Sequence, residues 1–428
     1  MSAPPVAAQR YLDRHGIKGP WQLAGEARPG FLGAVVIPSL AEGGRLFATL
    51  RSLAANPAAW NNRFLVVVVC NHSQAVDRQD RLQNELDLAR LTDYAQGSDL
   101  NLVWIDAVSP DLEVPANRAG VGFARKLGMD LALQYLDWST DPLLVCLDAD
   151  TLVEDNYLQA VGRHFLWSSK GAAVLPYRHQ PGVDSKQQAA IDRYELFLRS
   201  YVYGLRLAGS PYAFNTVGSA MACRASSYVR CGGMNCRKAG EDFYFLQKLA
   251  KTDGIDLLSG TIVHPEPRVS ERVPFGTGRS MARLLAGDRR GVLFYPAATF
   301  RILSDWLQLV ECNMTADPEK ILFLAHQTSP VLADYLAQLD WRSAWPRIQK
   351  THRCSIRLQQ AFHVWFDGFR TLRLIHLLCE TEFGRGEPEE ILPDYFTWEG
   401  RSAPASLAAM LEVLRVADKA VLDKRSKI

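Results

Sequence analysis

The chain has 428 residues, of which 48% are hydrophobic and 22% are charged, a balance that is typical of globular proteins and excludes disorder as the dominant state. Its 48 Lys and Arg residues face 46 Asp and Glu residues, so the formal charge of +2 gives no overall field for nucleic acid or anionic lipid. We therefore expect no nucleic-acid partner, and the length predicts two or three domains or one large domain with an appendage.

No apolar run is long enough for a membrane-spanning helix. The longest, Phe64–Cys70, falls far short of the about 20 residues that such a helix needs. Residues 1–5 lack the basic start of a signal peptide. The sequence therefore predicts no integral membrane segment and a cytoplasmic location. The cysteines within apolar runs, such as Cys70 and Cys146, indicate buried and reduced thiols.

A polar leader, residues 1–30, precedes an alternation of short apolar runs and helical patterns. The apolar runs predict strands at 33–38, 65–69, 100–105 and 143–147. Helical spacing predicts helices at 46–53, 78–96 and 122–135. Strands that are apolar on both faces and alternate with helices predict a mainly parallel sheet flanked by helices. We assign this α/β domain to residues 31–287.

Beyond about Gly287 the pattern changes to helical spacing, as in Phe300, Leu303 and Trp306. Residues 296–428 therefore predict a helical C-terminal region. Five of the ten tryptophans lie here. They indicate either a core between helices or an aromatic binding groove.

Two aspartates follow directly on the expected strand at 143–147. Asp148 and Asp150 are separated by one alanine. In open α/β sheets, ligands bind beyond the carboxyl ends of the strands. Mg²⁺ commonly uses one or two carboxylates together with substrate phosphates, so the pair indicates a metal–diphosphate site. The alternative is that both aspartates form a turn or cap a helix.

Further charged residues stand at two expected helix starts. Glu241 and Asp242 open an amphipathic helix, where they either cap the helix or supply a base for an acceptor hydroxyl. Residues 117–126 open another helix with two glycines and cations that include Arg118 and Arg125. Helix N-termini bind anions, and arginine adds paired donors for phosphate.

These segments together resemble the family 2 glycosyltransferases of the GT-A fold over residues 31–285. Residues 35–42 resemble the opening strand and nucleotide-binding turn, and residues 117–126 resemble the helix start that leads to Arg125. Asp148-Ala149-Asp150 matches the DxD metal motif, and Glu241-Asp242 matches the ED motif with the catalytic base. The order of these motifs also fits. The resemblance implies a GT-A-type sheet.

The resemblance also implies the residues of the site. Asp242 is the expected base, and Glu241 orients the acceptor. The nucleotide-sugar site comprises Pro38, Ser39, Glu42, Asn71, Arg118, Arg125, Asp148, Gly218 and Ser219. Asn71 stands where the family usually has acids, and its amide can still hydrogen-bond a base edge. Mn²⁺ or Mg²⁺ would be held by Asp150, Asp148 and His264.

His264 ends an apolar run about twenty residues after the expected Glu241-Asp242 helix, and the alternative is an ordinary hydrogen-bonded histidine. The stretch that follows carries Arg268, Arg272 and Arg279 with two glycines. It indicates either a lid over the donor or a polar loop.

The resemblance thus implies a metal-dependent, inverting enzyme that moves a sugar from a nucleotide-diphosphate donor to an acceptor hydroxyl. The Gln-x-x-Arg-Trp signature of processive synthases is absent, which favours a single addition. The acceptor is a saccharide, a lipid-linked compound or a small molecule. Two alternatives stay open: a sugar-nucleotide nucleotidyltransferase, and a non-catalytic scaffold that binds sugar or nucleotide.

Overall fold

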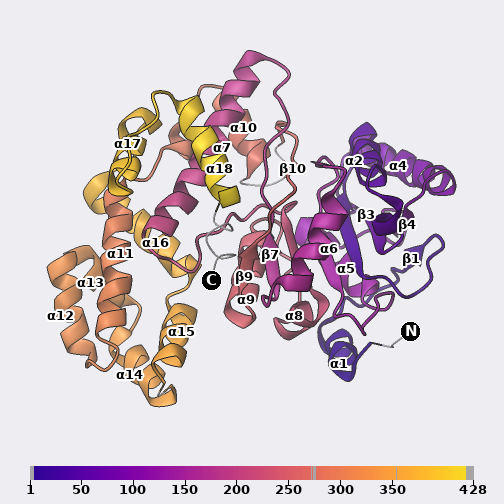
Figure 1. Ribbon diagram of the computed structural model, residues 1–428. Coiled ribbons are helices and arrows are strands. Elements are labelled where there is room, and N and C mark those ends of the chain that lie inside the picture. Colours follow the sequence, from indigo (N-terminus) through magenta and orange to yellow (C-terminus); the bar gives the residue numbers. More distant parts are fainter. Residues whose placement is uncertain (1–3, 271, 273–275, 353, 421–428) are drawn as a thin grey trace. The chain divides into compact units, whose positions relative to one another are not determined.

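The computed structural model describes residues 4–270, 272, 276–352 and 354–420, without the side chains of 417–420. The chain forms two compact units, and Figure 1 labels most of their elements. Unit 1 comprises the described parts of Met1–Gln188, Thr216–Ala282 and Asp418–Ile428, and unit 2 combines Ala189–Asn215 with Arg283–Ala417.

Unit 1 is built on an eight-stranded sheet with the strand order β1-β4-β3-β2-β5-β8-β7-β9, and a second sheet pairs β10 with β6. The strands are β1 Leu23–Ala24, β2 Gly33–Ser39, β3 Phe64–Asn71, β4 Asn101–Ala107, β5 Leu143–Cys146, β6 Leu152–Val153, β7 Ala172–Val174, β8 Met221–Arg224, β9 Ile255–Leu257 and β10 Val263–His264. Strands β4, β3, β2 and β5 run parallel, whereas β8 is antiparallel to both of its neighbours. The predicted mainly parallel sheet is confirmed.

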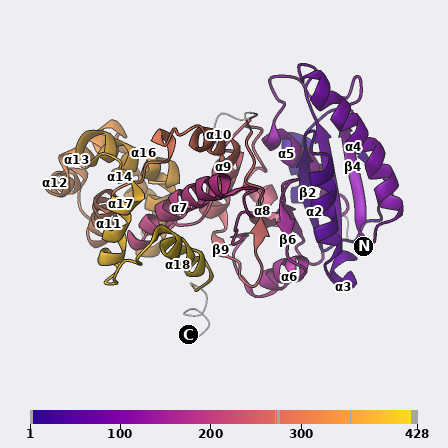
Figure 2. The ribbon, with the colours of Figure 1, turned by 90° about the horizontal axis from the view of Figure 1, so that it is seen from above.

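Helices cover both faces of this sheet. They are α1 Val6–His15, α2 Gly44–Ala54, α3 Ala58–Asn61, α4 Arg78–Gln96, α5 Val121–Ala132, α6 Tyr157–Trp167, α8 Ala225–Arg230 and α9 Glu241–Thr252. Val35 and Val66 pack into one core with residues of α2, α4 and α6. Helix α5 lies on the opposite face, and Figure 2 shows the sheet between α5 and α4. Gly128 of α5 packs so closely that an added Cβ would lie 2.4 Å from Val36 Cγ1.

The leader, residues 1–30, is part of unit 1 over its described residues. Strand β1 extends the sheet by pairing antiparallel with β4. Tyr11 of α1 donates a hydrogen bond to Asp130 Oδ1 at 2.8 Å, and the Ile17 amide donates to Asp130 Oδ2 at 2.9 Å. The buried carboxylate of Asp130 therefore anchors a segment whose sequence alone shows no period.

Unit 2 is helical, as the sequence predicts for the C-terminal region. Its elements are η1 Arg290–Val292, α11 Ala297–Cys312, α12 Pro318–Thr328, α13 Pro330–Gln338, α14 Trp341–Thr351, α15 Ser355–Trp365, α16 Gly368–Leu378, the π-helical turn η2 Cys379–Phe383, α17 Pro388–Trp398 and α18 Leu407–Ala420. Trp306, Trp341 and Trp345 are fully buried. Tryptophans thus fill the core between the helices, which is one of the two expected roles.

The boundary differs from the sequence prediction at two segments, of which the smaller, residues 283–287, belongs to unit 2. Residues 189–215 lie inside the predicted α/β domain, yet they belong to unit 2. Most of them form helix α7, Ser185–Leu207. Its apolar residues Leu196, Tyr203 and Leu205 share one core with the C-terminal helices, and this packing decides the assignment. A further helix, α10, spans Thr277–Leu285.

Two further expectations concern membranes and thiols. No helix within the described part of the chain combines the length and apolar composition that a membrane crossing requires. All eight cysteines are free, and Cys70 and Cys146 are buried, as expected from their apolar surroundings.

Candidate functional site

The ends of several strands meet at one edge of the sheet in unit 1. Ser39 ends β2 and Asn71 ends β3, and these strands are parallel. Pro38 precedes Ser39 in β2 and pairs with Val69. Because parallel strands end at the same edge, the sequence-predicted residues of both strands lie there.

Strands β5 and β8 bring further predicted residues to this edge. Strand β5 ends at Cys146, just before Asp148, and antiparallel β8 begins opposite it, with Met221 paired to Cys146. Gly218 and Ser219 precede β8, with Ala220 between them and the strand. An antiparallel strand starts where its neighbour ends, so both residues approach the edge at which Asp148 leaves it.

Arg125 links two of the predicted carboxylates. This α5 residue is only 2% exposed, and its guanidinium is ion-paired with both Asp148 and Glu241. Glu241, the first residue of α9, is itself buried. A guanidinium enclosed in this way holds the two carboxylates in place and has little surface left for a diphosphate. Arg125 thus holds Asp148 and Glu241 through ion pairs, whereas the sequence predicts that Arg125 and Glu241 contact the substrates.

Gly218 makes room for this guanidinium. A Cβ at residue 218 would lie 2.3 Å from Nη2 and 2.7 Å from Nη1 of Arg125. Arginine side chains usually move aside, but this one is buried and doubly ion-paired. Glycine is therefore required at position 218 by close packing against Arg125.

Asp242 follows Glu241 in the first turn of α9 and is partly exposed. Its Oδ1 accepts a hydrogen bond from the Phe243 amide at 2.7 Å. Burial and then the neighbouring carboxylate of Glu241 raise the pKa of Asp242 well above the ordinary value, and Arg125 acts in the opposite direction. A carboxylate whose pKa approaches neutrality is suited to accept a proton near pH 7.

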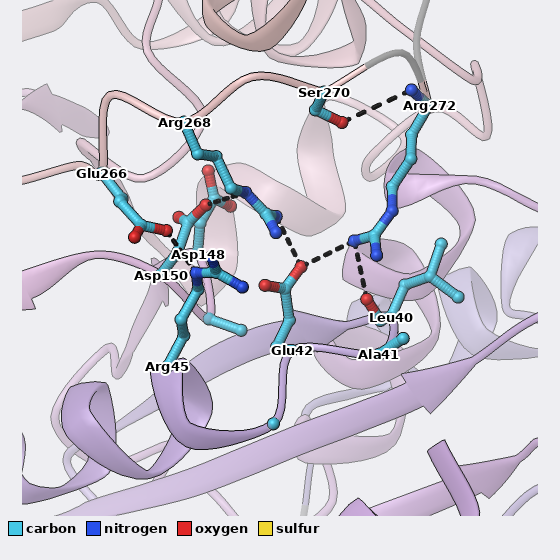
Figure 3. Close-up of polar contacts among 12 residues, drawn as sticks. Leu40, Ala41, Glu42, Arg45, Asp148, Asp150, Glu266, Arg268, Ser270 and Arg272 are labelled. Carbon is cyan, nitrogen blue, oxygen red and sulfur yellow. Dashed lines mark hydrogen bonds and ion pairs between the residues drawn. The ribbon is translucent and has the colours of Figure 1, made fainter. Parts of the chain in front are cut away.

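A second set of ion pairs surrounds Asp150, and Figure 3 shows it. Arg268 Nε lies 2.9 Å from Asp150 Oδ2, and Arg268 Nη2 lies 2.6 Å from Glu42 Oε1. Arg272 Nη1 reaches the same Glu42 oxygen at 2.9 Å and the Leu40 carbonyl at 2.7 Å. Arg268, which follows β10, thus joins one carboxylate after β2 to one after β5, and Arg272 gives Glu42 a second partner.

Charge and burial compete at Asp150. Burial raises the pKa of Asp150 to about 7, whereas the positive charge of Arg268 acts to lower it. The negative charge of Asp148 adds to the effect of burial.

The turn that carries Glu42 is held in an uncommon conformation. Ala41 has a φ of 51° and Gly43 a φ of 55°, in the left-handed region. The Ala41 amide donates to Asn84 Oδ1 at 2.8 Å, and the Gly43 amide donates to Asp87 Oδ2 at 2.9 Å. Two side chains of α4 thus compensate the strain of an alanine with positive φ.

Three buried oxygens of this site have no hydrogen-bond partner among the described residues. They are Ser39 Oγ, Ser219 Oγ and Glu42 Oε2. Buried polar atoms are rarely left without a partner in folded proteins. All three belong to residues predicted to bind the nucleotide-sugar, and a polar ligand with hydroxyl or amide groups would satisfy them.

His264 lies at the end of β10, but its ring is engaged elsewhere. Its Nδ1 is 3.0 Å from the Arg178 carbonyl oxygen, and its Nε2 is 3.9 Å from Glu154 Oε1. The backbones of His264 and Asp150 are linked through Gln180. Its Nε2 donates to the His264 carbonyl oxygen at 2.8 Å and to the Asp150 carbonyl oxygen at 2.9 Å. The structure therefore does not bring the His264 ring together with Asp148 and Asp150.

The two aspartates fit a cation that is shared with a substrate. Within the described ranges, no three His, Cys, Asp or Glu side chains are grouped to hold a metal. Mg²⁺ usually takes one or two carboxylates and completes its shell with phosphate and water. Asp148 and Asp150 supply two such carboxylates, so their chemistry fits a cation bound jointly with a diphosphate.

Arg118, like the ring of His264, does not take part in the ion pairs around Asp148 and Asp150. Its guanidinium lies over the Phe123 ring, 4.9 Å from the centroid. Phe123 also makes an edge contact with Trp21 of the leader. Arg118 thus packs on the start of α5, and this contact gives no sign of a phosphate site.

Arg268 contacts Asp150 and Glu42, but the sequence analysis does not place it among the residues of the site. The sequence marks it only as one of three arginines in a glycine-containing stretch. Part of that stretch, residues 271 and 273–275, lies outside the described residues. Its position four residues after His264 could have drawn attention to it, but no sequence pattern pairs it with Asp150.

Comparisons with known proteins give distant similarities. No protein-family model matches the chain, and no curated protein sequence matches it. Among solved structures, residues 1–349 of TarS from S. aureus in complex with UDP-GlcNAc share 14% identity, with a TM-score of 0.40, over 77% of this chain and 91% of that chain. The mannosyltransferase PcManGT from Pyrobaculum calidifontis, in complex with GDP-Man and Mn²⁺, shares 17% identity, with a TM-score of 0.37, over 97% of this chain and 93% of that chain. Similarity at this level is too weak to assign an activity.

Proposed function

We propose that the chain is a glycosyltransferase that moves a sugar from a nucleotide-diphosphate donor to an acceptor hydroxyl. The observation that carries the proposal is the convergence of Asp148, Asp150 and Asp242 at one sheet edge. Arg125 is ion-paired with Asp148 and with Glu241, the residue that directly precedes Asp242 in α9, and Asp148 contributes to the raised pKa of Asp242. The two carboxylates proposed to bind the metal, Asp148 and Asp150, would therefore lie in the same site as the proposed base, Asp242.

The donor would lie along the carboxyl ends of β2, β3 and β5. Asn71 at the end of β3 would face the base, because its amide both donates and accepts hydrogen bonds. Glu42 Oε2 and Ser39 Oγ would take hydroxyl groups of the nucleoside. The diphosphate would then reach Asp148 and Asp150.

The transfer step would be a direct displacement. Asp242 accepts the proton of the acceptor hydroxyl, whose oxygen forms a bond to the anomeric carbon of the sugar. The bond from that carbon to the diphosphate oxygen breaks, and the nucleoside diphosphate leaves with the electron pair. Attack from the face opposite the leaving group inverts the anomeric centre.

Asp148 and Asp150 would hold Mg²⁺ or Mn²⁺ between them and the diphosphate. Such a cation supplies Lewis-acid stabilisation of the charge that develops on the leaving phosphoryl oxygens. Arg125 fixes the direction of Asp148 and Glu241, and through Glu241 it fixes the start of α9. Asp242 is thereby presented from a rigid helix.

The test is release of nucleoside diphosphate from a panel of nucleotide-sugars by the full chain, first with Mn²⁺ and then with chelator. We expect one donor to be hydrolysed slowly in the presence of Mn²⁺, and Asp242→Asn to reduce this turnover. Pyrophosphate release from a nucleoside triphosphate and a sugar phosphate would instead indicate a nucleotidyltransferase. A thermal shift by a donor without turnover under any condition would indicate a binding scaffold.

A further inference from the structure

We propose that Arg268 is a built-in cation of the donor site that competes with the divalent metal for Asp150 and transfers to the diphosphate when the donor binds. The inference rests on the proposed function, because it assigns a second role to the same site. It starts from a contact within unit 1, the ion pair between Arg268 and Asp150.

One guanidinium serves two carboxylates from different strands. Arg268 Nε contacts Asp150 Oδ2 at 2.9 Å while Nη2 contacts Glu42 Oε1 at 2.6 Å. Figure 3 shows Arg268 between Asp150 and Glu42. The Asp150 oxygen that faces Arg268 is a ligand that a metal would use, so a metal and the guanidinium compete for it.

The backbone near Arg268 is fixed beside Asp150. Strand β10 pairs with β6, with His264 opposite Leu152, and Gln180 joins the carbonyl oxygens of His264 and Asp150. Gln187 Nε2 donates to the Pro267 carbonyl oxygen at 3.0 Å. Arg268 follows Pro267 directly, so its backbone is anchored close to Asp150. A change of its side-chain rotamer is then enough to move the guanidinium away from this carboxylate.

The position of Arg268 weakens metal binding at Asp150 in the free protein and strengthens it when the donor is bound. A cation that approaches Asp150 meets the positive charge of Arg268 at short range, where repulsion is poorly screened. A diphosphate offers several oxygens that suit the paired donors of a guanidinium. When Arg268 turns to the diphosphate, Asp150 is left to the metal.

Glu42 keeps a partner during this exchange. Arg272 Nη1 contacts the same Oε1 of Glu42 at 2.9 Å. A buried carboxylate that lost its only counter-ion would oppose the movement. The second arginine removes this obstacle, and Arg268 is free to leave Glu42.

Arg272 also provides a matched control. Its guanidinium shares Glu42 with Arg268 and otherwise contacts the Leu40 carbonyl and Asp80, at 2.7 and 3.4 Å. Among the described residues, none of these guanidinium contacts involves Asp150. Arg272→Gln removes the same charge from the same carboxylate and leaves the Arg268–Asp150 pair in place.

The experiment measures Mn²⁺ binding to the full chain without nucleotide, by the loss of the free Mn²⁺ signal in electron paramagnetic resonance. We expect Arg268→Gln to bind Mn²⁺ about tenfold more tightly than the natural chain, the ratio that corresponds to losing one charge-assisted contact. Arg272→Gln should match the natural chain. Equal affinity in all three proteins, or no binding by any of them, would overturn the proposal.

A second arm follows the diphosphate. With chelator present, Arg268→Gln should bind a nucleoside diphosphate about tenfold more weakly than the natural chain in calorimetry, since one charged contact is lost. Unchanged affinity would contradict the transfer of Arg268 to the diphosphate. If Arg268→Gln does not fold, Arg268→Met replaces it, with the same expected gain in Mn²⁺ affinity because methionine also removes the positive charge. No gain in a folded Arg268→Met protein would refute the competition.

The two proposals fail separately. If no nucleotide-sugar is turned over while Arg268→Gln still gains Mn²⁺ affinity, the glycosyltransferase assignment is wrong and the competition at Asp150 stands. If donor turnover is found while Mn²⁺ affinity is the same in both proteins, the assignment stands and the role of Arg268 is wrong.

Discussion

The guanidinium of Arg125 and the carboxylate of Glu241 form an ion pair in which both side chains are at most 5% exposed. The two residues are 116 positions apart in the sequence. Helix α5 carries the first and helix α9 carries the second, and Asp148 shares the same guanidinium. Removal of one partner would leave buried charge without compensation, which costs far more than the loss of an exposed pair.

Arg125→Met should therefore lower the free energy of unfolding by about 3–5 kcal/mol, as found for one-sided removal of buried pairs. The measurement is urea unfolding followed by circular dichroism. Arg230→Met is the control, because Arg230 is half exposed and pairs with Asp253 at 2.7 Å. Its loss should cost at most about 1 kcal/mol. Equal effects of the two substitutions would mean that the Arg125 pairs are not a structural support.

Gly218→Ala should disturb the same guanidinium from the opposite side. The added Cβ would overlap Arg125 Nη1 and Nη2, and overpacking of this kind costs about 1–3 kcal/mol. Turnover should fall as well, because Asp148 and Glu241 follow the displaced guanidinium. Gly97→Ala is the control, since nothing lies within 4 Å of a Cβ at that position. Urea unfolding measures the loss of stability, and donor hydrolysis measures the loss of turnover. Equal results for Gly218→Ala and Gly97→Ala would contradict the prediction.

Asp242→Asn should reduce turnover by about 10²–10⁴-fold, the usual contribution of a positioned general base. Donor affinity should stay within error, because the base acts on the acceptor. Asp253→Asn, at the opposite end of α9, makes the same chemical change away from the site. Steady-state rates together with calorimetry for the donor separate the two effects. Near-normal turnover in Asp242→Asn would remove this residue from the mechanism.

The raised pKa of Asp242 predicts opposite pH trends for turnover and stability. Turnover should rise with pH, with its acidic limb above the ordinary Asp value of about 3.9, because the base must be ionised. The folded protein favours the protonated carboxyl, so this group's contribution to stability is full below the unfolded pKa and is lost as pH rises through the folded pKa. Asp242→Asn should therefore raise the melting temperature more at mildly alkaline than at acidic pH. An acidic limb at the ordinary carboxylate value would contradict this.

Truncation after Gly287 should yield an aggregating protein. The cut leaves α7 in the chain but removes the helices that cover Leu196, Tyr203 and Leu205. Exposed apolar surface of this kind causes association. Light scattering of the purified fragment, beside the full chain, provides the measurement. A monomeric fragment with a cooperative unfolding transition would show that α7 does not depend on these partners.

The sequence was most informative where structure depends on neighbours along the chain. Apolar runs such as Leu65–Val69 predict buried strands at the observed places because side-chain alternation and burial are local properties. The two aspartates after β5 are placed by the same logic, since a residue that follows a buried strand must emerge at the sheet edge. The helical character of residues 296–428 likewise follows from periodic spacing.

The three-dimensional packing decided which distant residues meet. Arg268 and Glu42, 226 positions apart, share an ion pair that no spacing rule contains. Helix α7 has an apolar face that the sequence shows, but only packing decides that it joins the C-terminal helices. Arg125 appears in the sequence as a phosphate ligand at a helix start, and its burial between two carboxylates gives it a positioning role. Local patterns fix which face of an element is apolar, whereas the partner of a charged side chain depends on the course of the whole chain, because ion pairs form between any elements that folding brings together.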